Sequence, residues 1–124
     1  MREILFRGKR PDNGEWVCGF LVKMFGAYHI IDEGDENTSY EVIPETVGQY
    51  TGLNDKHGKR IFEGDIAKVL QGKDKDIAYV GFENGAFILY PETGNIYERT
   101  LWSYWYNDWD VEVIGNITDN PELL

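Results

Sequence analysis

The stretch YTGLNDKHGKRIFEGDIAKV, residues 50–69, decides the fold of this chain. Its first half crowds charged side chains around Gly58, and glycine accepts the positive φ that a tight turn demands. Its second half alternates, so that Ile66 and Lys68 share one face of an extended strand while Ala67 lies on the other. The stretch therefore predicts a short hairpin followed by a long strand.

The same charge density would also suit a metal-binding loop, and the spacing tests that alternative. An EF-hand loop needs an oxygen ligand at position 1 and a glycine at position 6. With Gly58 at the glycine position the first ligand is Leu53, and with Gly34 there it is His29. Neither side chain supplies an oxygen, and the two histidines lack a paired zinc spacing. We therefore expect no metal site.

A hydrolase is a further alternative for this loop. It would use His57 as a general base with Asp55 beside it, and it predicts a concave pocket that holds both side chains. The competing interpretation is a solvated histidine at a turn. Neither serine lies in a nucleophile motif and no glycine cluster opens a phosphate-binding helix, so we expect no catalytic or cofactor-binding residue.

The composition is that of one ordinary domain. The chain has 124 residues, of which 42% are hydrophobic and 15% aromatic, enough to bury a core. No apolar run approaches the roughly 18–20 residues of a membrane span, and the N-terminus lacks the apolar core of a signal peptide. We expect a cytoplasmic protein with no membrane contact. We also expect one domain over residues 1–124, with a subdivision into 1–50 and 51–124. The lone cysteine, Cys18, is interpreted as a small buried hydrophobic residue.

Short β-branched and aromatic runs between glycines predict a mainly β fold with little helix. Tight turns are expected at three places, where Asn or Gly tolerates positive φ: Asp12–Gly14, Phe25–Ala27 and Glu83–Gly85. Pro44 limits the residues before it to an edge strand or a strand end, and it favours a short helical turn after them. Many short strands at this spacing suggest a small barrel or sandwich.

The charge balance bears on nucleic-acid binding. The net charge is −10, and residues 69–124 carry only three Lys or Arg against ten Asp or Glu. Duplex DNA and RNA attract basic faces, so phosphate-backbone binding is not expected as the main activity. The one candidate for direct binding is the cluster Arg7, Lys9 and Arg10. Mimicry of DNA by the acidic half is a second form of the same alternative.

An aromatic cluster near the C-terminus is the most distinctive feature of the composition. The candidate interface consists of Trp102, Tyr104, Trp105, Tyr106 and Trp109. Its members would fill the core, form an oligomer or partner interface, or stack on a ligand. The aromatic positions in 98–109 fit neither the helical nor the strand period, and we favour a strand, because aromatic residues pack well on pleated surfaces.

Three segments resemble the YopX family of bacteriophages and prophages of Gram-positive bacteria. They are ILFRGKRPDNGEWVCGFL at the start, YEVIPETVGQYTGLNDKHGKRIFEGDIAKV in the middle and VIGNITDNPELL at the end. The pieces occur in family order and cover almost the whole chain. The resemblance implies a small, mostly β protein with an SH3-like barrel component, here within 51–124, and oligomeric assembly. It implies no biochemical activity and assigns no catalytic or ligand residue.

These observations favour a binding or assembly module over an enzyme. We expect it to act through protein–protein contacts, as a homo-oligomer and with a host or phage protein as a possible partner. The nucleic-acid-linked role is the alternative from a different class. No cofactor is implied.

Overall fold

The computed structural model describes residues 2–124, except for the side chains of Trp105 and Tyr106. The fold is mainly β, built of antiparallel strands with little helix, as the sequence predicts. It divides into two compact units, Met1–Tyr50 and Thr51–Leu124, and strand β5 (Gly48–Asn54) begins in the first and ends in the second. No helix among the described residues is long and apolar enough to cross a membrane.

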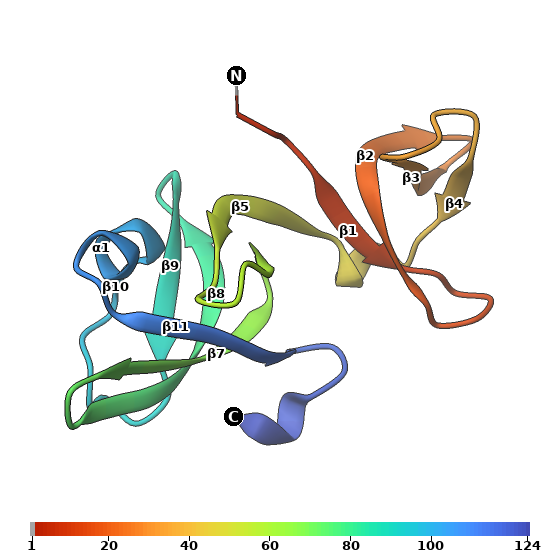
Figure 1. Cartoon of the computed structure of the whole chain (residues 1–124). Coiled ribbons are helices and arrows are strands. Elements are labelled where there is room, and N and C mark those ends of the chain that lie inside the picture. Colours follow the sequence, from red (N-terminus) through yellow and green to blue (C-terminus); the bar gives the residue numbers. More distant parts are fainter. Residues whose placement is uncertain (1) are drawn as a thin grey trace. The chain divides into compact units, whose positions relative to one another are not determined.

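The first unit pairs its strands in the order β4-β3-β2-β1-β5, labelled in Figure 1. These strands are β1 (Phe6–Lys9), β2 (Trp16–Met24), β3 (Ala27–Asp32) and β4 (Ser39–Glu41), followed by β5. A 3-10 turn, η1 (Pro44–Thr46), separates β4 from β5. Pro44 is its first residue, which confirms the short helical turn predicted there.

The β2–β3 hairpin has the turn predicted from the sequence. Met24 pairs with Ala27, which leaves Phe25 and Gly26 as a two-residue loop. Their φ angles are 53° and 76°, both positive, as a type I′ turn requires. The loop therefore places a phenylalanine at a position that usually carries Asn or Gly.

The core of the first unit is small. Leu5, Ile30, Val42 and Tyr50 are buried in it. Gly8 is needed beside Val42, because a Cβ atom at position 8 would lie 2.8 Å from the Val42 Cβ. Cys18 is half-buried on β2 rather than fully buried.

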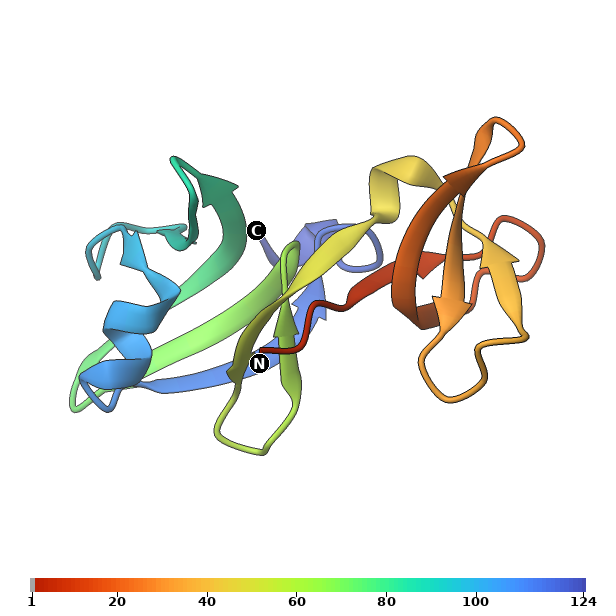
Figure 2. The same ribbon diagram turned by 90° about the horizontal axis from the view of Figure 1, so that it is seen from above.

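The second unit contains a five-stranded sheet in the order β10-β9-β8-β7-β11, seen from a second direction in Figure 2. Its strands are β7 (Asp65–Gln71), β8 (Asp74–Glu83), β9 (Ala86–Pro91), β10 (Arg99–Thr100) and β11 (Asp110–Asn116). The end of β5 and the short strand β6 (Arg60–Phe62) form the predicted hairpin, whose loop contains Gly58 at φ 80°. The chain closes with a 3-10 turn, η2 (Pro121–Leu123).

Alternation along β7 places the core as predicted. Ala67 and Val69 are buried in the main core of the unit, while Lys68 is exposed on the opposite face. The buried members of this core come from strands, a loop and a helix: Ile61, Ala67, Val69, Ala78, Val80, Leu89, Ile96, Leu101, Tyr104 and Val111. Ile66 is fully buried as well, on the side away from Ala67.

The preference for a strand over 98–109 is wrong. Only Arg99 and Thr100 form a strand, and a helix, α1 (Leu101–Tyr106), follows at once. Leu101 and Tyr104 are three residues apart, which brings them to one helical face, and both are buried at 1% exposure. The Thr100 Oγ1 accepts a hydrogen bond from the Ser103 backbone N–H and so caps the first turn.

The resemblance also implied an SH3-like barrel, and this is not confirmed. The strand pairings give two antiparallel sheets that do not close on themselves. β10 and β11 are the two edges of the five-stranded sheet and lie at opposite ends of its order.

Candidate functional site

The charged loop after β5 is held in place by the carboxylate of Asp55. Asp55 Oδ1 accepts hydrogen bonds from the backbone N–H groups of His57 and Lys59, each at 2.9 Å. Its Oδ2 accepts one from the Val113 N–H at 3.0 Å, and the Lys56 N–H donates to the Val111 carbonyl at 3.0 Å. The loop therefore satisfies backbone groups along the edge of β11 that does not pair with β7, which protects that edge from other strands.

These donors also fix the charge of Asp55. Burial on its own would raise the pKa of the carboxyl group. The N–H groups of Val113, Lys59 and His57 together outweigh burial, and the pKa lies below its ordinary value. Asp55 is therefore a charged structural acceptor with donors on both oxygens.

The His57 side chain contacts Glu112. Its Nε2 lies 2.8 Å from Glu112 Oε2, and its side chain is 64% exposed. The hydrogen bond to His57 is the largest cause that lowers the pKa of the Glu112 carboxyl, and partial burial opposes it. His57 thus forms an ion pair on the surface when it is protonated, and its ring is not oriented by Asp55.

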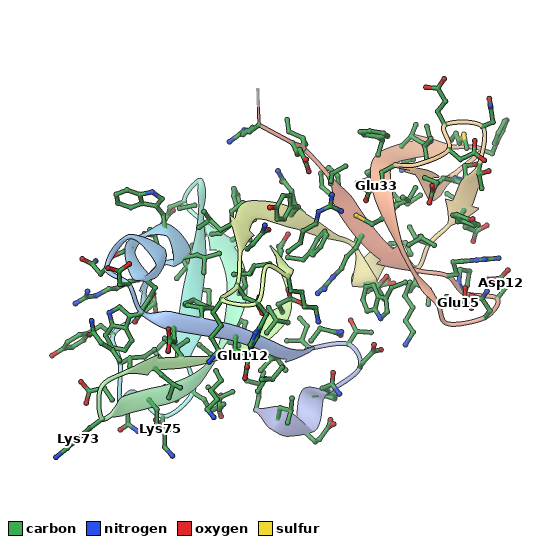
Figure 3. All side chains as sticks on the ribbon, in the orientation of Figure 1. Asp12, Glu15, Glu33, Lys73, Lys75 and Glu112 are labelled. Atoms are coloured by element: carbon green, nitrogen blue, oxygen red, sulfur yellow. The ribbon has the colours of Figure 1, made fainter. Side chains whose placement is uncertain are left out.

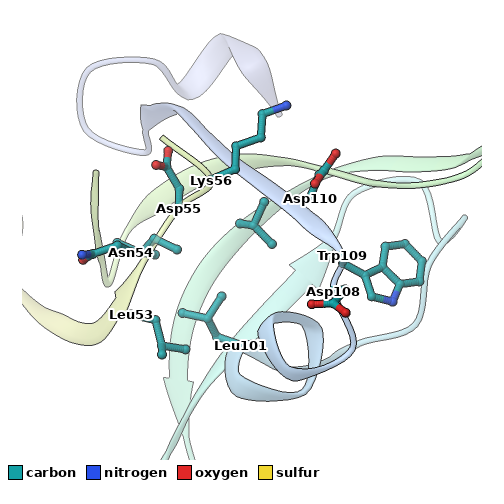
Figure 4. Close-up of a pocket in the computed structure, with 10 residues that line it drawn as sticks. Leu53, Asn54, Asp55, Lys56, Leu101, Asp108, Trp109 and Asp110 are labelled. Atoms are coloured by element: carbon teal, nitrogen blue, oxygen red, sulfur yellow. The ribbon is translucent and has the colours of Figure 1, made fainter. Parts of the chain in front are cut away.

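A pocket of about 270 Å³ lies beside the Asp55 loop. Figure 4 shows the residues that line it, with Asp55 and Lys56 on the loop after β5 and Asp108 and Trp109 on the loop after α1. Its apolar part is formed by Leu53, Ile61, Leu101 and Val111. His57 does not line it. The hydrolase alternative required His57 and Asp55 in one pocket, and the structure does not bring them together in that way.

A second buried carboxylate organises a loop that sequence reasoning missed. Asp76 on β8 accepts hydrogen bonds from the N–H of Ile77, from the N–H and Oγ1 of Thr93 and from the N–H of Asn95. Burial opposes ionisation, but these donors keep the pKa of Asp76 below its ordinary value. Only a polar Thr-Gly-Asn loop after a strand hinted at this role. Within the described residues, no group of three His, Cys, Asp or Glu side chains is placed to hold a metal ion.

The members of the predicted aromatic interface lie in different environments. Trp102 is 57% exposed, whereas Tyr104 is 1% exposed and donates its hydroxyl hydrogen bond to the Tyr97 carbonyl. Trp109 is half-buried with its ring edge-on to Tyr104, the centroids 5.2 Å apart. The side chains of Trp105 and Tyr106 lie outside the described part of the chain.

Sequence reasoning also missed Tyr97. This residue is 76% exposed, and the Arg99 guanidinium carbon lies 5.6 Å from the centroid of its ring. Tyr97, Arg99 and Trp109 line a hollow of about 380 Å³, which we call the Tyr97 hollow. No signal in the sequence joins these three residues, because Tyr97 and Arg99 precede α1, Trp109 follows it, and only the fold brings them together.

The basic cluster of the first unit lies on a tryptophan. The Arg7 guanidinium carbon is 4.9 Å and the Lys9 ammonium 5.9 Å from the centroid of the Trp16 ring. Arg10 forms an ion pair with Asp12 at 2.7 Å instead, on the β1–β2 hairpin where Figure 3 labels Asp12 and Glu15. The three cations therefore do not form one undivided patch.

The family described as "YopX protein" matches residues 5–124. Among the solved structures that match is the crystal structure of protein EF1440 from Enterococcus faecalis, with 26% sequence identity and a TM-score of 0.60. That match covers 100% of this chain and 99% of the other. No curated protein matches the chain.

Proposed function

The chain belongs to the YopX family, and from that premise we propose that it is a phage- or prophage-encoded binding or assembly module. It acts through protein–protein contacts rather than by catalysis, and it associates with copies of itself. This role needs exposed surfaces rich in residues that contribute strongly to binding.

The observation that carries the proposal is the Tyr97 hollow. Tyrosine, arginine and tryptophan are the residue types most enriched at binding hot spots, and Tyr97, Arg99 and Trp109 line this one surface. Tyr104 anchors the neighbouring helix in the core and also lines the hollow. The surplus of carboxylates in residues 69–124 favours a partner with basic side chains.

Affinity capture from host cells tests the proposal, with wild-type and variant proteins used in parallel. We expect a protein that binds the wild type in a fixed ratio and is lost with Tyr97→Ala. Phe82→Ala is the matched control, because Phe82 is a 53% exposed aromatic residue that does not line the hollow. Light scattering after size exclusion tests self-association. A clean monomer that captures nothing beyond a tag-only control contradicts the proposal.

The nucleic-acid-linked role remains the second candidate, because Arg7, Lys9 and Trp16 gather on one face of β1 and β2. Titration against single-stranded and duplex oligonucleotides at low salt tests direct binding, and a signal that does not fall with added salt removes it. For mimicry, Asp55, Asp65 and Asp76 are too buried to imitate phosphates. DNA mimicry would therefore rest on the exposed carboxylates alone.

A further inference from the structure

The pocket beside the Asp55 loop, which we call the Trp109 pocket, has room for one side chain rather than for a large ligand. Its volume is about 270 Å³, whereas cavities that hold drug-sized molecules span roughly 300–1,000 Å³. Its apolar floor combines residues of β5, β6, α1 and β11: Leu53, Ile61, Leu101 and Val111. A ligand that fits this pocket is therefore narrow and carries an apolar stem.

Trp109 lines the pocket and is fixed there by contacts with α1. Its backbone N–H donates to the Tyr104 carbonyl at 3.1 Å, and its ring lies edge-on to the Tyr104 ring, which is buried. Trp109 itself is only half-buried, so part of it remains accessible to a ligand. Of the aromatic side chains, the indole attracts a cation most strongly to its face.

Carboxylates outnumber cations at the Trp109 pocket. Three aspartates line it, Asp55, Asp108 and Asp110, against one lysine, Lys56. Asp55 already accepts backbone hydrogen bonds on both oxygens. Asp108 and Asp110 are exposed, and within the described residues neither forms an ion pair, so these two carboxylates are available to a ligand.

Lys56 does not cancel this charge inside the pocket. Figure 4 shows its side chain extending away from Leu53 and Leu101, which places its ammonium at the rim. The ammonium acts on a carboxylate outside the pocket: the hydrogen bond from His57 is the main cause that lowers the pKa of Glu112, and the charge of Lys56 lowers it further. The pocket therefore favours a cation that enters with an apolar stem.

We propose that the Trp109 pocket receives an arginine side chain of a partner protein, with the guanidinium against Trp109 and within reach of Asp108 and Asp110. The stem of arginine packs on apolar surface, and its planar guanidinium both stacks on an indole and pairs with carboxylates. This inference rests on the proposed function and names the residue that the partner supplies. Trp109 also lines the Tyr97 hollow, so a partner seated on that hollow reaches this pocket as well.

Binding of N-acetyl-arginine methylamide to the full chain tests the contact, followed by heteronuclear NMR at low salt, which detects weak binding. We expect the amide signals of Leu53 and Val111 and the indole N–H signal of Trp109 to shift, while the amide of Lys73, at the β7–β8 turn, does not. The citrulline derivative has the same shape without the charge and should shift none of them. The lysine derivative should bind more weakly, because an ammonium lacks the planar fork of the guanidinium.

Substitution of the two available carboxylates gives the sharper test. Asp108→Asn and Asp110→Asn should each weaken binding of the arginine derivative by about two- to fivefold, the size expected for exposed charge pairs. Asn tolerates the φ of 57° at Asp108, so an unchanged Tm should accompany the loss. Glu122→Gln is the matched control, because Glu122 is an exposed carboxylate that does not line the pocket, and it should bind as the wild type does.

The possible outcomes separate this inference from the proposed function. If host cells yield a partner that Tyr97→Ala loses, but neither aspartate variant changes its capture or the binding of the arginine derivative, the arginine contact is wrong while the proposed function stands. If no protein is captured, the proposed function fails and the contact fails with it. If the arginine derivative shifts no signal of the pocket, or the citrulline or lysine derivative binds as tightly, the pocket does not select a guanidinium and the proposal is overturned.

Discussion

Replacing Asp55 by asparagine is expected to destabilise the second unit although the side chain keeps its shape. The carboxylate accepts from three backbone N–H groups, two on one oxygen and one on the other. If the amide oxygen of the new asparagine accepts the hydrogen bonds from the His57 and Lys59 N–H groups, its NH₂ group faces the Val113 N–H. Both of these groups are donors, so no hydrogen bond forms between them. One charge-assisted hydrogen bond is lost and a donor at the sheet edge is left unpaired.

The magnitude follows from those contacts. A hydrogen bond to a charged group contributes about 1.5–3 kcal/mol, and an unpaired donor adds to its loss. We expect a loss of about 3 kcal/mol in the free energy of unfolding, and a fall of roughly 10–20 °C in Tm for a unit of this size. Urea unfolding followed by tryptophan fluorescence measures it. Asp108→Asn is the control, because Asp108 is an exposed residue at φ 57° that Asn tolerates, and it removes the same charge.

Stability measured at low pH distinguishes the loss of these hydrogen bonds from a general loss of packing. Because the folded pKa of Asp55 is lowered, its contribution is present above the unfolded value of about 3.9 and is lost as pH falls through the folded pKa. The difference between wild type and Asp55→Asn should therefore shrink below about pH 4. A variant as stable as the wild type at neutral pH, or a difference that acid leaves unchanged, would refute the reasoning.

Three further outcomes are expected. Tyr104→Ala should lose about 3–5 kcal/mol of unfolding free energy by leaving a cavity, whereas Tyr104→Phe should lose only about 1 kcal/mol with its hydroxyl, both measured by urea unfolding. The hydrogen bond to Glu83 raises the pKa of Tyr90 to about 12, so its contribution is present below the ordinary value and lost as pH rises through 12. Burial also raises the pKa of Tyr104, so absorbance titration should show late tyrosines, and Glu83→Gln should move the Tyr90 titration to lower pH. Asp76→Ala should speed amide hydrogen exchange at Thr93 and Asn95, and exchange as slow as in the wild type would contradict its role.

The sequence was informative where one local rule decides the structure. The turns at Phe25–Gly26 and at Gly58 follow from glycines that accept positive φ, and the strand from Asp65 follows from alternation. The 98–109 segment lacked such a rule, because its helix depends on Leu101 and Tyr104 meeting a core supplied by distant strands. Local patterns do not report that kind of contact.

The candidate sites likewise depend partly on local sequence and partly on contacts between distant residues. The charge density near Asp55 was visible in the sequence. The structural role of Asp55, however, depends on its hydrogen bond from Val113, 58 residues further along the chain. The Tyr97 hollow was invisible for the same reason, since it gathers side chains from separate elements. Among the aromatic residues, composition identified the cluster without separating buried Tyr104 from exposed Trp102.

The position of β11 in the sheet has a consequence for synthesis. The pairings that join β1, β2, β3, β4 and the start of β5 all lie within residues 1–50, so this sheet can form while the ribosome is still translating the rest. The second unit has to wait, because β11 is the last strand made and it pairs with β7, the first long strand of that unit. Until residues 110–116 emerge, one edge of β7 is open to other nascent chains. A ribosome that pauses late in this message therefore exposes the edge of β7 that the finished protein pairs with β11, while the other edge of β11 is covered by the Asp55 loop.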